Sequence, residues 1–214
     1  MSLRDEAKEN LAIVNETLFN GALREYRFDG INGPLIAIHG AGLSGWTKDG
    51  IRSFMPEYNV RGVLKYVGIL TKGIDSYLPL LDEEVRRYPR PTLVGFSTGG
   101  FIVLRYAEKY GWENVKNIVT IATPFGGNLE KYKAFGKSIE ETTAGSPLLN
   151  EIVNLNPPIG IVTSVFASED VHTPDPLAFG LNWEKVITGA KSHGDIQNHQ
   201  KWYDNILKHA IGIS

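Results

Sequence analysis

Short apolar runs alternate with longer segments in which apolar residues recur every three or four positions. The short runs read as strands, because they are continuous and bounded by polar, proline or glycine-containing stretches. They lie at 33–38, 61–67, 91–94, 115–122, 159–166 and 185–188. Helical spacing occurs at 74–88 and 101–110, and again in the segment that closes the chain.

The beginning of the chain has the pattern of an amphipathic helix. Leu3, Leu11 and Leu18 are among its apolar residues at helical spacing, and Asn20-Gly21 supplies a stop signal. We therefore expect a helix over residues 2–20. A polar connector follows, and no strand is expected before residue 33.

Strands and helices alternate through the middle of the chain. This alternation requires right-handed crossovers, and it therefore predicts a parallel sheet covered by helices on both faces. A chain of 214 residues, 42% of them hydrophobic, can form one substantial core. The predicted fold class is α/β, with a single domain over 1–214 and a mostly parallel sheet of about six strands.

Residues 128–157 interrupt this alternation. They are polar at first, and then Ser146 is placed as a helix N-cap and Pro147 as the first helical residue. The segment leaves the carboxyl edge of the sheet, where open α/β sheets bind ligands, so we interpret it as a short cap insertion over a site. The alternative is an ordinary surface excursion.

Charge and composition narrow the classes of function. Lys and Arg number 22 and Asp and Glu 24, and neither sign forms a long block, so nucleic acid and anionic membrane surfaces are not expected partners. The absence of cysteine excludes disulfides, a thiolate nucleophile and cysteine metal sites. No apolar run approaches the roughly eighteen residues of a membrane span, and no apolar leader follows Met1. We expect a cytoplasmic protein without membrane insertion that acts on something small or neutral.

The sequence Gly-Phe-Ser-Thr-Gly-Gly at 95–100 joins a predicted buried strand to a predicted helix. Glycines on both sides of Ser97 permit a turn so sharp that side chains at positions 95 and 99 would clash. The serine is then held in strained dihedral angles above the sheet, at the positive end of the following helix. This G-x-S-x-G pattern is typical of a nucleophilic serine, although a glycine-rich turn can also be a mere connection.

Two further loops supply the partners that a serine nucleophile requires. A serine hydroxyl is a poor nucleophile at neutral pH, so a histidine must accept its proton and a carboxylate must orient the imidazole. His193 and Asp170 both follow predicted strands, and the carboxyl ends of parallel strands meet along one edge of a sheet. We therefore predict a catalytic set of Ser97, Asp170 and His193.

Both partners have rivals in the sequence. His199 lies in the closing helix, where a lone histidine is usually half-exposed surface. Glu169 and Asp175 share the loop of Asp170, and either could be the orienting acid. Glu169 would have to reach with a longer and more flexible side chain, and Asp175 lies between two prolines in a stretch that reads as a surface turn. Asp170 is therefore the favoured acid.

These motifs together resemble those of the α/β-hydrolase superfamily, particularly its small lipase and esterase branch. The matching stretches are His-Gly-Ala-Gly at 39–42, the serine motif at 95–100, Ala-Thr-Pro-Phe-Gly-Gly at 122–127, the loop at 168–174, and His193. The chain order serine, acid, histidine is also that of this fold. The resemblance implies an oxyanion hole formed by the backbone N–H groups of Ala41 and Thr98.

The chain departs from the family pattern in two places. The opening β-hairpin of the family has no room before residue 33, and the cap is too short for a large lid. The second departure argues against long-chain lipase action with activation at an interface.

The expected function is that of a serine hydrolase that cleaves carboxylic esters with short to medium acyl chains through an acyl-enzyme. We expect a small-molecule acyl ester as partner and no metal or organic cofactor. Apolar residues close to the site in the sequence are expected to line the acyl pocket: Phe96, Phe125, Leu148, Leu149 and Ile152. The same catalytic residues could serve a thioesterase, an amidase or an acyltransferase, and a non-catalytic binding domain could retain the fold.

Overall fold

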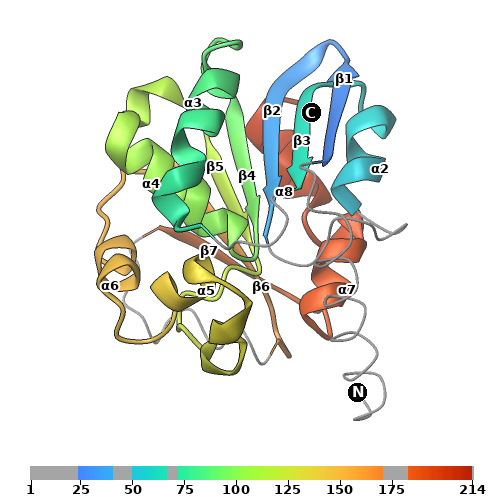
Figure 1. Ribbon diagram of the computed structural model, residues 1–214. Helices are drawn as coiled ribbons and strands as arrows, with labels where there is room; N and C mark the ends of the chain where they lie inside the picture. The colour runs from blue at the N-terminus through green and yellow to red at the C-terminus, as the bar shows by residue number, and fades with distance from the viewer. Residues whose placement is uncertain (1–23, 41–49, 67–71, 171–182, 214) are drawn as a thin grey trace.

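The computed structural model describes residues 24–40, 50–66, 72–170 and 183–213, which form one sheet between two helical layers (Figure 1). The sheet has seven strands in the order β1-β3-β2-β4-β5-β6-β7. Only β1 runs antiparallel to its neighbour, and the other described pairs are parallel. The strands are β1 (Arg24–Asp29), β2 (Asn32–His39), β3 (Val60–Tyr66), β4 (Thr92–Phe96), β5 (Ile118–Ile121), β6 (Val162–Ala167) and β7 (Glu184–Thr188).

Helices cover both faces of the sheet, which confirms the predicted fold class. The main helices are α2 (Gly50–Glu57), α3 (Leu78–Val85), α4 (Gly99–Tyr110), α7 (His193–Asn198) and α8 (Asp204–Ile211). Short 3₁₀ turns lie at η1 (Ile74–Tyr77), η2 (Trp112–Asn114), η3 (Glu130–Phe135) and η5 (Gln200–Trp202). Each face has its own apolar core. Leu81 and Phe101 of α3 and α4 belong to one, and Phe54 and Leu207 of α2 and α8 belong to the other.

The six predicted strands correspond to β2–β7, with ends that differ by a few residues. The prediction of a connector before residue 33 is wrong, because β1 lies there and pairs antiparallel with β3. Tyr26 and Phe28 pack against the second core and alternate with the exposed Glu25 and Arg27. An edge strand that buries one face needs only these two apolar residues, so it has no continuous apolar run. The helix expected at 2–20 lies outside the described residues.

The segment that closes the chain was expected to be one helix, but it is divided. His199 has the extended dihedral angles φ −122° and ψ 103°, and it ends α7 after six residues. The η5 turn follows, and α8 begins at Asp204. The break lets α7 stay at the carboxyl ends of the strands while α8 packs along the sheet (Figure 1).

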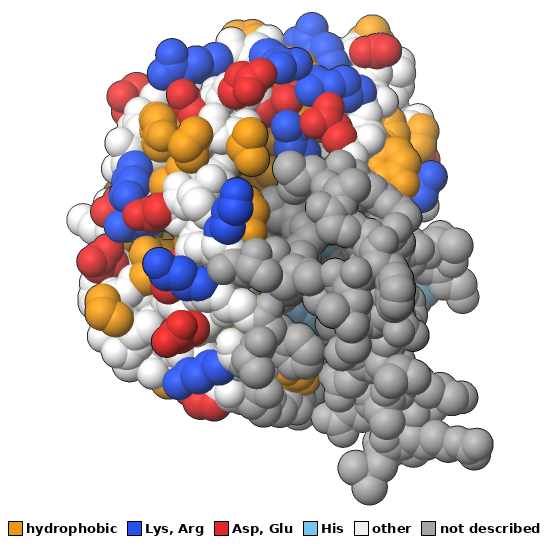
Figure 2. Space-filling model, viewed as in Figure 1, with side chains coloured by type: hydrophobic (Ala, Val, Ile, Leu, Met, Phe, Trp, Pro, Cys, Tyr) orange, Lys and Arg blue, Asp and Glu red, His pale blue; other side chains and the backbone are white. Residues whose placement is uncertain are grey.

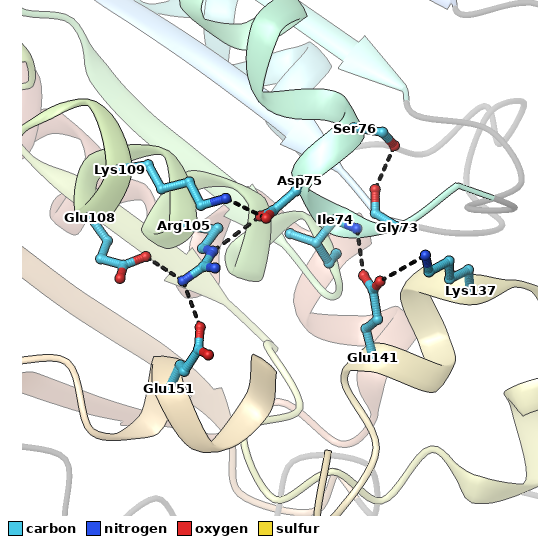
Figure 3. A network of polar contacts seen from close by, with 10 residues as sticks. All are labelled: Gly73, Ile74, Asp75, Ser76, Arg105, Glu108, Lys109, Lys137, Glu141 and Glu151. Atoms are coloured by element: carbon cyan, nitrogen blue, oxygen red, sulfur yellow. Dashed lines mark hydrogen bonds and ion pairs between the residues drawn. The ribbon is translucent and has the colours of Figure 1, made fainter. Parts of the chain in front are cut away.

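The insertion at 128–157 contains η3, α5 (Lys137–Glu141) and α6 (Pro147–Val153), at the end of the sheet where β4 and β5 finish (Figure 1). The Ser146 hydroxyl accepts a hydrogen bond from the Leu149 N–H at 3.2 Å, which confirms the predicted N-cap. Figure 3 shows polar contacts that attach this segment to α4 and η1. Arg105 of α4 contacts Glu151 of α6 at 2.8 Å, and Glu141 of α5 accepts the Ile74 N–H at 2.8 Å.

The described surface carries charges of both signs. Figure 2 shows acidic and basic side chains interspersed over the face of α3 and α4, with apolar side chains scattered between them. Several of these charges are paired with a neighbour in the sequence, as Glu83 of α3 is with Arg87 at 2.6 Å. The mixed pattern agrees with the net charge of −2.

Candidate active site

Ser97 lies at the join between β4 and α4. Its backbone has φ +52°, in the left-handed region that residues other than glycine rarely adopt. A Cβ at Gly95 would lie 2.5 Å from the Gly100 Cα, and one at Gly99 would lie 2.3 Å from the Ile38 carbonyl oxygen. The clash predicted at both positions is therefore confirmed, and glycine there is required by close backbone packing.

The structure brings Ser97, His193 and Asp170 into one hydrogen-bonded chain. The His193 Nε2 lies 3.0 Å from the Ser97 Oγ, and the His193 Nδ1 lies 2.7 Å from the Asp170 Oδ2. Because a carboxylate can only accept, Nδ1 donates to Asp170 and Nε2 is left to accept the serine proton. This is the arrangement that a general base needs.

Three strand ends position these side chains. Ser97 directly follows β4, Asp170 follows β6 through a turn in which its N–H donates to the Ala167 carbonyl at 3.3 Å, and His193 opens α7 after β7. The side chain of Asp170 has no exposed surface, whereas that of His193 is 27% exposed. A buried carboxylate beside a partly open imidazole keeps the acid fixed and leaves the base accessible to a substrate.

The rival residues have other partners. Glu169 is exposed and pairs with the Lys191 Nζ at 2.6 Å. The Nε2 of His199 lies 3.7 Å from the Asp195 Oδ1, and this side chain is about half-exposed. Asp175 lies outside the described residues. Of the candidate acids and histidines that the structure describes, Asp170 and His193 are the pair that lies beside Ser97.

The two stretches assigned to the oxyanion hole lie against each other. A Cβ at Gly40 would lie 2.7 Å from the backbone N of Thr98, so the end of the His39-Gly40 stretch closely approaches the first turn of α4. Thr98 is buried at the N-cap of α4. His39 is also buried, and its ring stacks on Phe96 with centroids 4.4 Å apart. Ala41 lies outside the described residues.

The residues expected to line an acyl pocket are mostly core residues. Phe96 has no exposed surface and lies between His39 and Tyr203, on the face of the sheet that α8 covers. Ile152 and Leu149 are buried in the other core, and Leu148 is half-buried against it. Of these four residues, Leu148 is the one that is partly exposed. Phe96 and Ile152 have no exposed surface that could contact a ligand.

Phe125 has an aromatic neighbour, Trp183, that no sequence motif indicates. Its ring lies 5.4 Å from the Trp183 ring and 5.5 Å from that of Phe101, at the end of β5. Trp183 precedes β7 as a lone aromatic residue, and its sequence context carries no signal of this contact.

The sequence motifs also do not single out Asp195, which lies two residues after His193. A signal for it exists, because its three-residue spacing from Ser192 is that of a helix-capping pair.

The described residues contain no group of three or more His, Asp or Glu side chains that could hold a metal ion. None of the described helices has the length and apolar character of a membrane span.

Comparison with known proteins supports the fold. Residues 87–157, which contain the serine motif and the whole cap insertion, match a family model described as the alpha/beta hydrolase fold. No curated protein matches the sequence. An alpha/beta hydrolase enzyme from a metagenome of sediments of the Mar Chica lagoon, Morocco, is similar with a TM-score of 0.63 and 18% identity, over 89% of this chain and 94% of that one.

Two further solved structures are similar at the same level. A monoacylglycerol lipase of Paleococcus ferrophilus has a TM-score of 0.62 and 14% identity, over 90% of this chain and 100% of that one. A structure from the thaumarchaeon Nitrososphaera gargenis, from work on carboxylesterases, has a TM-score of 0.60 and 14% identity, over 89% and 95%. The chain therefore has the α/β-hydrolase fold, as its motifs indicated.

Proposed function

We propose that this protein is a serine hydrolase that cleaves carboxylic esters through an acyl-enzyme intermediate. The observation that carries the proposal is the position of the His193 ring, 3.0 Å from the Ser97 Oγ on one side and 2.7 Å from Asp170 on the other. A surface histidine has no need of a fully buried carboxylate behind it. A general base does, because the carboxylate selects the tautomer and stabilises the imidazolium.

The first half of the reaction forms the acyl-enzyme. The Ser97 Oγ attacks the ester carbonyl carbon while its proton passes to the His193 Nε2. The negative charge that develops on the carbonyl oxygen accepts hydrogen bonds from the backbone N–H groups of Thr98 and Ala41. The tetrahedral species then collapses, the C–O bond to the alcohol breaks, and the leaving oxygen takes the proton from Nε2.

The second half releases the acid. Water attacks the acyl carbon and gives a proton to the His193 Nε2, and the second tetrahedral species expels the Ser97 oxygen. That oxygen takes the proton back, which restores the free enzyme with the carboxylic acid as product. Asp170 stays ionised throughout and moves no proton.

The cap supports a short-chain substrate range. Its helices are tied to α4 and η1 by the contacts of Arg105 and Glu141, and Leu149 is buried in the core beneath them. We propose that a segment held in this way does not open as a lid, so the acyl chain is limited to what fits beneath the closed cap. We propose acyl groups of roughly two to eight carbons. Among the similar structures, one is a monoacylglycerol lipase by name and one comes from work on carboxylesterases.

A panel of acyl esters of graded length, run beside matched thioesters and amides, tests this proposal. The wild-type protein should hydrolyse the short esters fastest, without a rise in rate above the solubility limit of a long-chain ester. Ser97→Ala should lower kcat by about 10⁶-fold, to the background of binding and the oxyanion hole. Equal turnover by wild type and Ser97→Ala would contradict the proposal, and preference for thioesters or amides would reassign the substrate class.

A further inference from the structure

The loop at 189–192 leads into His193, the first residue of α7, and hydrogen bonds join this loop to a second acid, Asp195. The N–H of Asp195 donates to the Ser192 Oγ at 3.1 Å, and the Asp195 Oδ2 accepts the Lys191 N–H at 2.8 Å. Both hydrogen bonds therefore span His193, because they join Asp195 to Ser192 and Lys191, the two residues that precede His193. These two bonds connect the chain on the N-terminal side of His193 to a residue on its C-terminal side.

The other oxygen of Asp195 is bound to a separate element. Its Oδ1 accepts the Trp202 Nε1–H of the η5 turn at 3.2 Å. The Trp202 ring also lies against the start of the same loop, since a Cβ at Gly189 would be 3.6 Å from the ring carbon Cζ3. Asp195 therefore connects the loop to η5, and the indole ring lies beside the loop at Gly189.

The charge on Asp195 strengthens both contacts. Burial of this side chain opposes ionisation, but the hydrogen bonds from the Lys191 N–H and from Trp202 outweigh it, so the pKa of Asp195 is lowered. An ionised carboxylate forms stronger hydrogen bonds than a neutral acceptor does. At neutral pH the loop is therefore held by two charge-assisted bonds on different oxygens.

We propose that Asp195 is a positioning residue, which sets the place of the His193 imidazole between Ser97 and Asp170 by fixing the backbone on both sides of it. This inference rests on the proposed function. His193 has to keep two hydrogen bonds at once, of 2.7 Å and 3.0 Å, to side chains on two other strand ends. A displacement of about 1 Å in such a base costs about 10²-fold in rate.

The test compares Asp195→Asn with Glu169→Gln. Asparagine offers one acceptor oxygen, so either the Lys191 N–H or the Trp202 N–H would face an amide N–H. Glu169→Gln removes an ion pair to the same lysine but leaves the loop backbone untouched. Asp195→Asn should lower kcat by about tenfold to 10²-fold and leave KM within about twofold, whereas Glu169→Gln should change neither.

A second readout does not depend on turnover. The ring resonances of His193 in NMR spectra should shift in Asp195→Asn and stay in place in Glu169→Gln. Unchanged resonances and unchanged kcat in folded Asp195→Asn would overturn the proposal, even if the variant melts at a lower temperature. Shifted resonances in a protein whose wild type hydrolyses no ester would contradict the proposed function and leave the positioning contact in place.

Trp202→Phe keeps the test decisive if Asp195→Asn does not fold. It removes the indole N–H and keeps an aromatic ring beside Gly189. The His193 resonances should shift and kcat should fall several-fold, by less than the roughly 10²-fold limit of a misplaced base. Wild-type values for both in Trp202→Phe would overturn the proposal.

Discussion

Ser97 combines an unfavourable backbone conformation with a crowded surrounding. A non-glycine residue at φ +52° costs about 1–3 kcal/mol, and it persists because the neighbouring contacts fix it. The Ser97 N–H donates to the Ile121 carbonyl at 2.9 Å, and the Gly100 N–H returns to the Ser97 carbonyl at 3.0 Å. The strain is therefore maintained by β5 and α4, and it places the hydroxyl beside His193.

The position of the acid leads to a prediction at the same scale. Asp170→Asn keeps the shape of the side chain but turns a two-oxygen acceptor into a group that can donate toward Nδ1. The imidazole is then held with its proton on Nε2, where it cannot accept from Ser97. We expect kcat to fall by about 10³–10⁴-fold with the fold intact, measured on a short acyl ester.

Glu169→Gln is the matched control, because it neutralises the adjacent carboxylate, which is exposed. Its kcat should stay close to the wild-type value, as expected for a screened surface charge. A large loss in Glu169→Gln together with a small loss in Asp170→Asn would contradict this assignment and give the orienting role to Glu169.

At the scale of elements, one buried acid joins a helix to the antiparallel edge of the sheet. Glu84 of α3 accepts hydrogen bonds from the Arg27 Nη1 and Nη2, both at 2.9 Å, and lies 3.2 Å from the Lys65 Nζ. Its side chain is 1% exposed. Burial alone would raise the pKa of Glu84, but the bonds from Arg27 and Lys65 outweigh it and lower that pKa.

A lowered pKa in the folded state makes the contribution of Glu84 to stability depend on pH. The contribution is present above the ordinary glutamate pKa of about 4.3 and is lost as the pH falls through the lower folded value. Glu84→Gln should therefore reduce the free energy of unfolding by about 1–3 kcal/mol at pH 7, and the difference from wild type should shrink below about pH 4.

Urea unfolding at several pH values measures this difference. Glu83→Gln serves as the control, since Glu83 is exposed and pairs with Arg87 just beyond the end of α3, and it should cost less than about 0.5 kcal/mol. A Glu84→Gln difference that is the same at pH 7 and in acid would show that packing, and not the charge, is what the variant removes.

At the scale of the whole molecule, the features that could be predicted are those with a local signal. Buried parallel strands are continuous apolar runs, so β2–β7 were found, and loops after such strands were expected at one edge. β1 was missed because Tyr26 and Phe28 alternate with charges on an edge strand. The break at His199 was missed because the apolar spacing continues across it.

The residues of the candidate site also divide into those with a local sequence signal and those without one. The serine motif and the order of acid and base follow from short stretches and from the positions of strands, so Ser97, Asp170 and His193 could be chosen beforehand. The face on which a side chain packs depends on the finished sheet. Phe96 is next to Ser97 in the sequence, yet its ring lies in the core beneath α8, and no local pattern indicates that.

The most direct test of the account is the mass of the protein after reaction with a fluorophosphonate. An activated serine is phosphonylated because its hydroxyl is deprotonated by the neighbouring base during attack, which an ordinary surface serine is not. The account predicts one adduct per chain, mapped by peptide analysis to Ser97, and none in Ser97→Ala. Labelling at another serine with Ser97 unmodified, or no labelling of folded wild-type protein, would contradict it.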